Sequence, residues 1–70
     1  MPLSFAVLGK QVVVQATHGN IKLKQHLLEL GFNIGAPVTV ISSLNGNVIV
    51  KVKNIRIAVE KSLANKIICA

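Results

Sequence analysis

The sequence is poor in the residues on which much binding chemistry depends. It has no tryptophan or tyrosine, two phenylalanines, one cysteine and two acidic residues among 70. With so few aromatic rings, sequence-tolerant binding of single-stranded nucleic acid, in which bases stack on aromatic side chains, is disfavoured. A single cysteine excludes an internal disulfide. Because no export signal precedes it, this cysteine favours a reducing, cytoplasmic location.

Catalytic groups are equally scarce. Glu29 and Glu60 lie far apart in the sequence, and no Cys/His nucleophile arrangement, glycine-rich phosphate loop or G-x-S-x-G motif is present. We therefore predict that the protein is not an enzyme, has no catalytic residues and needs no cofactor.

Metal binding has only a weak signal. His26 and Glu29 are three residues apart on an expected helix, and His18 and Cys69 are more distant candidate ligands. Stable transition-metal sites usually need three or four ligands. We predict no metal site, and we expect His26 to be an ordinary boundary residue.

Basic and apolar residues are abundant. Eight lysines and arginines give a formal net charge of +6 and a pI near 10.1, while 51% of the residues are hydrophobic and the mean hydropathy is +0.61. The charge favours anionic partners, and the surplus of apolar residues predicts contact with another protein or a second copy of the chain. The uncharged run 30–50 contains Asn, Gly, Pro and Ser, which are typical of turns. We therefore expect membrane contact only through a partner.

Local patterns predict a mainly β protein, formed by a single domain over residues 1–70. A valine-rich strand over 11–17, buried on both sides or strongly coiled, precedes a helix over about 21–30. Strands over 38–43, 48–53 and 55–59 follow, then a short helical turn over about 60–65 and a last strand over 66–70. About five short strands around one small core favour closure into a barrel, because an open sheet would expose long edges.

Helix and turn boundaries have specific signals. Asn20 is a typical N-cap, while Gly31 and Phe32 are typical of a Schellman C-cap. Leu23, Leu27 and Leu30 share one helix face, which we assign to the core. Asn45-Gly46 is a strong hairpin signal, and Gly35 is expected to have a positive φ.

The alternation of apolar and polar residues then predicts which side chains of the later strands face the core. Val48, Val50 and Val52 are predicted to point inward, as are Ile55, Ile57 and Val59 on the next strand. Lys51, Lys53 and Arg56 are predicted to share the outer face.

Several of these residues also form a family pattern. The pieces "LKQHLLELGFNIGAPVTVI" and "GNVIVKVKNIRIAVEKSLANKIIC" resemble the FeoA family, small cytoplasmic proteins of bacterial ferrous-iron uptake with an SH3-like barrel. Much the same pattern is similar to the C-terminal SH3-like domain of DtxR-type iron repressors. Asn54 stands where the family usually has glycine, but asparagine tolerates the same left-handed conformation.

The resemblance implies a non-catalytic adaptor that binds the cytoplasmic, GTPase-containing part of the FeoB membrane ferrous-iron transporter. We keep two alternatives open: a nucleic-acid-binding small barrel, although we expect no stable nucleic-acid complex, and a stand-alone DtxR-type module that binds a regulatory peptide. Self-association is also open.

Two groups of residues are candidates for binding. The predicted partner surface consists of Leu28, Phe32, Lys51, Lys53 and Arg56. Lys22 and Lys24, in the first helical turn, could hold an anion beside free N–H groups, although a solvated face is the simpler interpretation.

Overall fold

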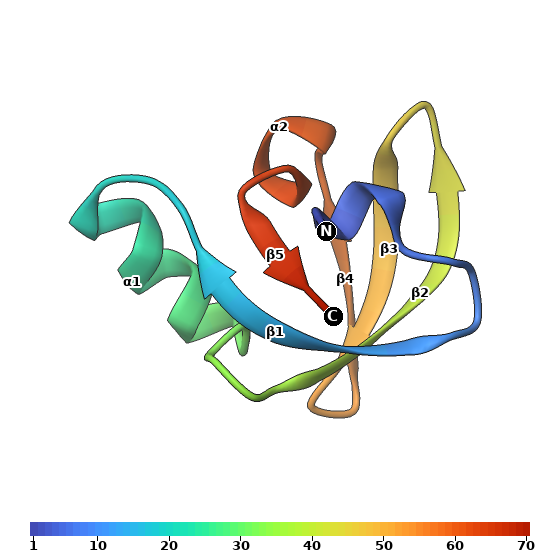
Figure 1. Ribbon diagram of the computed structural model, residues 1–70, viewed down its shortest axis with the longest axis horizontal. Coiled ribbons are helices and arrows are strands. Elements are labelled where there is room, and N and C mark those ends of the chain that lie inside the picture. Colours follow the sequence, from blue (N-terminus) through green and yellow to red (C-terminus); the bar gives the residue numbers. More distant parts are fainter.

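A computed structural model describes residues 1–70 as one curled antiparallel sheet with short helices at its margins (Figure 1). The strand order is β4-β3-β2-β1-β5. The mainly β prediction of five strands is confirmed. The elements are η1 (Leu3–Phe5), β1 (Gln11–Thr17), α1 (Ile21–Leu30), β2 (Pro37–Leu44), β3 (Asn47–Val52), β4 (Ile55–Val59), α2 (Lys61–Ala64) and β5 (Ile67–Cys69).

Strand β1 gives the sheet its curl. Its first half pairs with β2 and its second half with β5, with a register shift between Val14 and Ala16. A bulge of this kind bends a strand and increases its twist. Of the three consecutive valines, Val12 and Val14 are buried whereas Val13 is 42% exposed. Burial on both sides is therefore wrong, and the bulge supports the alternative prediction of a coiled strand.

Two tight turns join β2, β3 and β4 into a meander. Asn45 and Gly46 have φ values of 54° and 86°, and Lys53 and Asn54 have φ values of 50° and 66°. Two consecutive residues with positive φ form the two-residue turn whose twist matches antiparallel strands. Asn54 thus adopts the left-handed conformation expected of it.

The predicted inward faces hold in β3 but only partly in β4. Val48, Val50 and Val52 are buried, as is Val59. Ile55 pairs with the buried Val52 and therefore lies on the core side of the sheet, as predicted. However, 53% of its surface is exposed, so the core does not bury it. Because β4 is an edge strand, the core does not extend far enough to cover its first residue.

Helix α1 has both predicted caps. The Asn20 side chain accepts a hydrogen bond from the Leu23 N–H at 2.8 Å. At the other end Gly31, with φ 108°, donates to the Leu28 carbonyl at 3.0 Å, and Phe32 donates to the Leu27 carbonyl at 2.9 Å. These two bonds are the Schellman pair.

The core lies inside the curled sheet and is closed by the N-terminal segment. Leu27 is fully buried, and Leu23 and Leu30 pack against the core from the same helix face. The 3-10 turn η1, which the sequence did not predict, inserts the fully buried Leu3. The Met1 amino group donates to the Cys69 carbonyl at 2.8 Å, and the Cys69 N–H donates to the Met1 carbonyl at 2.7 Å. The N-terminus therefore covers the outer edge of β5.

Candidate docking surface on the outer face of the sheet

The structure brings together no cluster suited to metal chemistry. No group of three or more His, Cys, Asp or Glu side chains is placed to hold an ion. His18, His26 and Glu29 are exposed, whereas Cys69 is fully buried. Burial raises the pKa of the Cys69 thiol above its ordinary value, and the nearby N-terminal charge acts in the opposite direction. A protonated, buried thiol is a poor nucleophile and a poor ligand.

No helix of the structure has the length and apolar character needed to cross a bilayer.

Phe32 does not belong to a surface. Its side chain is fully buried in the core cluster, so the predicted partner role is corrected. The physical reason is the C-cap itself, because a Schellman motif turns the residue after the glycine back against the helix. Leu28, one turn earlier, is 55% exposed and stays available to a partner.

The basic residues of β3 and β4 are brought together as predicted. Lys51 and Arg56 are direct cross-strand partners, and Lys53 lies in the turn that joins their strands. All three are exposed. We call Lys51, Lys53 and Arg56 the basic face. The like charges of Lys51 and Arg56 on opposite strand positions repel each other, and an anionic partner would relieve that repulsion.

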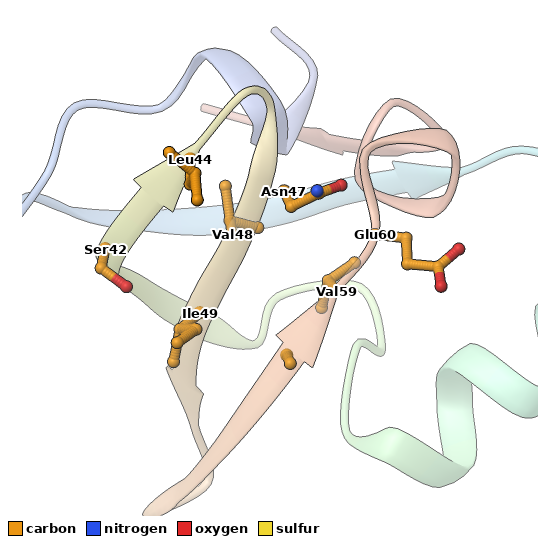
Figure 2. Close-up of a pocket in the computed structure, with 8 residues that line it drawn as sticks. Ser42, Leu44, Asn47, Val48, Ile49, Val59 and Glu60 are labelled. Atoms are coloured by element: carbon orange, nitrogen blue, oxygen red, sulfur yellow. The ribbon is translucent and has the colours of Figure 1, made fainter.

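An apolar hollow adjoins the basic face on the same strands. We call it the hairpin groove; its volume is about 290 Å³, and its lining is Ser42, Leu44, Asn47, Val48, Ile49, Ala58, Val59 and Glu60. Figure 2 shows Leu44, Val48 and Ile49 on one side, with the Glu60 carboxylate directed away from them. Ser42, Ile49 and Ala58 form one row across β2, β3 and β4. The basic pair Lys51–Arg56 is the adjacent outward row.

The sequence did not predict this groove. A register shift between Val40 and Ser42 places Ser42 opposite Ile49. The residue types at this bulge do not distinguish it from a regular strand, so the sequence does not predict it. The only indication in the sequence was apolar residues at outward positions of these strands; within the groove lining, Leu44 is 73% exposed and Ile49 is 43% exposed.

The structure brings no further side chain to the predicted anion site of Lys22 and Lys24. Lys22 and Lys24 are exposed in the first turn of α1, where Asn20 already accepts the Leu23 N–H from its side chain and the Lys24 N–H from its carbonyl. The site stays a prediction. At the opposite end of α1, a Cβ on Gly31 would lie 3.5 Å from the Lys53 side chain, so the helix exit adjoins the basic face.

The fold defines a small barrel of the SH3-like class. A family model for the FeoA domain matches residues 1–70. The chain belongs to the FeoA family.

Similar proteins agree with this assignment. A protein of Methanocaldococcus jannaschii, named as a candidate Fe(2+) transport protein A, is 39% identical over 66 residues, covering 94% of this chain and 80% of its own. A crystal structure of an iron uptake regulatory protein, FeoA, has a TM-score of 0.91 at 28% identity, covering 99% of this chain and 93% of the other. Stenotrophomonas maltophilia FeoA, an SH3 domain protein crystallised with zinc, has a TM-score of 0.85 at 29% identity, covering 100% and 89%.

The SH3-like prediction is thus confirmed, and so is the resemblance to metal-dependent repressors at the level of fold. A manganese-dependent transcriptional repressor matches 96% of this chain over 39% of its own, with a TM-score of 0.82 and 13% identity.

Proposed function

We propose that this protein is a non-catalytic accessory of ferrous-iron uptake, located in the cytoplasm, that binds the GTPase-containing part of the FeoB membrane transporter. The observation that carries the proposal is the FeoA family match over residues 1–70. The 39% identical relative, named for Fe(2+) transport, supports the same process.

The surface supports a binding role. Basic residues outnumber acidic ones by eight to two, and the basic face lies beside the exposed apolar lining of the hairpin groove. An apolar centre with charged residues at its margin is typical of a protein interface, and the charges there mainly direct encounter and register. The chemistry of this face therefore fits an acidic protein surface.

Direct binding tests the proposal. The purified chain is titrated with the FeoB cytoplasmic domain of the same organism, without nucleotide, with GDP and with a non-hydrolysable GTP analogue. We expect saturable binding in at least one state. We also expect Lys51→Glu with Arg56→Glu to weaken it by about tenfold or more, because charge complementarity becomes repulsion.

Lys22→Glu with Lys24→Glu is the matched control. Like the test variant it replaces two cations by two carboxylates, but in the exposed first turn of α1, at the end opposite to the helix exit that adjoins the basic face. Negative side chains there also suit the helix dipole. We expect this double variant to bind like the unmodified protein. Absence of binding in every nucleotide state would refute the proposed function, and equal losses in both variants would show that only net charge matters. A DNA duplex at about 50 mM salt serves as the control ligand for non-specific phosphate binding.

A further inference from the structure

Strand β4 is the one end of the sheet that the chain leaves open. It occupies the edge position of the order β4-β3-β2-β1-β5, and the register pairs it only with β3. The opposite edge, β5, is covered by hydrogen bonds between Met1 and Cys69 and by the bridge between Pro2 and Ile68. The two edges of the sheet therefore differ in what the chain itself supplies.

The turn geometry identifies which backbone groups face outward. A two-residue turn makes its flanking residues, Val52 and Ile55, a hydrogen-bonded pair, and pairs then alternate along the strands. Ile55, Ile57 and Val59 thus bond to β3. Arg56 and Ala58 direct their N–H and C=O groups away from it. No side-chain hydrogen bond and no backbone hydrogen bond outside the ladders involves Arg56 or Ala58.

The open edge is regular and partly apolar. The β3–β4 register has no shift, whereas the β1–β5 and β2–β3 pairings each contain one. There is no proline in β4, and Ile55 is 53% exposed on its core side. Proteins usually protect edges by bulges, proline or charge. Here only the charge of Arg56 is present, and a partner of opposite charge would turn that protection into attraction.

We propose that β4 receives an extended acidic segment of the partner as an added antiparallel strand, hydrogen-bonded to Arg56 and Ala58. This inference rests on the proposed function and specifies how the partner is held. An added strand gains affinity from backbone hydrogen bonds and specificity from alternate side chains.

Charge and shape define the pattern of the segment. Its residue opposite Arg56 would share the outer face with Lys51 and Arg56, and is expected to be acidic. Its residue opposite Ala58 would extend the row Ser42, Ile49 and Ala58, beside the hairpin groove, and is expected to be uncharged. Side chains opposite Ile55 and Ile57 would lie on the core side and are expected to be apolar. Glu60 follows the strand at the other end, so acidic residues of the segment belong toward Lys53.

A second copy of the chain is the less favourable occupant. Pairing of two β4 strands about Ile57 would place Arg56 opposite Ala58 of the other copy, which the backbone would accept. However, each copy carries a net charge of +6, and the basic faces would be brought together. Charge therefore favours an acidic partner over self-pairing.

Amide hydrogen exchange at single-residue resolution tests the proposal. In the free protein the Arg56 and Ala58 amides should exchange fast, whereas those of Ile55, Ile57 and Val59 are protected. Addition of the FeoB cytoplasmic domain should slow Arg56 and Ala58 by about tenfold or more. Binding that leaves both amides fast would overturn the edge-strand mode while leaving the proposed function intact.

Two variants at one position separate backbone from side-chain effects. Ala58→Pro removes an N–H that β3 does not use, and proline is tolerated on edge strands. Ala58→Val keeps the N–H and adds a similar volume. We expect Ala58→Pro to weaken binding about tenfold relative to Ala58→Val. Equal affinities would overturn the proposal, provided that unchanged protection of Ile57 shows that the sheet is intact.

A synthetic peptide tests the edge independently of FeoB. The capped peptide VTVEVEE places its glutamates toward Arg56 and Lys53 when it lies antiparallel to β4. Methylation of its second and fourth amide nitrogens, which face β4, should abolish binding, whereas methylation of the third and fifth should not. Failure of the unmethylated peptide to slow Arg56 and Ala58 would overturn the proposal even if FeoB does not bind. Concentration-dependent protection of the same amides without any ligand would identify self-pairing and refute the acidic occupant.

Discussion

Phe32 and Leu28 provide the sharpest test of how this fold divides core from surface. The Phe32 side chain, two residues after α1 ends, is fully buried, whereas Leu28 within α1 is 55% exposed. Truncation of a buried phenylalanine to alanine typically costs about 3 to 5 kcal/mol. At about 0.05 to 0.15 kcal/mol per residue, the whole 70-residue chain has only about 3.5 to 10 kcal/mol of stability. Phe32→Ala should therefore lose about a third or more of the free energy of unfolding.

Leu28→Ala removes a side chain that the core does not hold. Its free energy of unfolding should change by no more than about 0.5 kcal/mol, while its affinity for the FeoB cytoplasmic domain falls. Urea denaturation, followed by far-UV circular dichroism, measures the free energy of unfolding of both variants. If Phe32→Ala does not fold, Phe32→Leu, which keeps an apolar side chain, still gives a measurable transition. The reasoning is refuted if Phe32→Ala loses less than about 1 kcal/mol, or if Leu28→Ala loses as much as Phe32→Ala.

Three further predictions concern local features. Lys51→Glu should raise the free energy of unfolding by about 0.2 to 1 kcal/mol at low salt, because it replaces a like-charge pair with Arg56 by an opposite one; a gain that is unchanged at high salt would contradict this cause. Asn20→Ala should lower it by about 1 kcal/mol through loss of the helix N-cap, whereas Asn20→Asp, which keeps the capping oxygen, should not. Cys69 should react with a thiol reagent only on unfolding. Burial raises the pKa of the Cys69 thiol above the ordinary value of 9.0, so its contribution to stability is complete below pH 9.0 and is lost as the pH rises through the folded pKa. The free energy of unfolding relative to Cys69→Ala should therefore fall at high pH, and a rise would contradict this direction.

The candidate docking surface was only partly predictable. Lys51 and Arg56 were placed on one outer face because a short turn between alternating strands fixes the register within a few residues. The hairpin groove depends on a bulge near Ile41, and the backbone alone decides where that extra residue falls. The open β4 edge likewise follows from strand order, which pairs residues distant in sequence.

The sequence by itself determined the local structure of this protein: the strand periods, the Asn20 cap, the Gly31 exit and the turns at Asn45-Gly46 and Asn54. These features depend on φ preferences and hydrogen bonds among residues a few positions apart. Only the tertiary structure decided how far the core extends. Alternation assigned Ile55 to the core side, but its exposure depends on what lies above the edge of the sheet. Burial of Phe32 and the open backbone of Arg56 and Ala58 are likewise set by how the barrel closes, because closure decides which surfaces and edges the chain covers with itself.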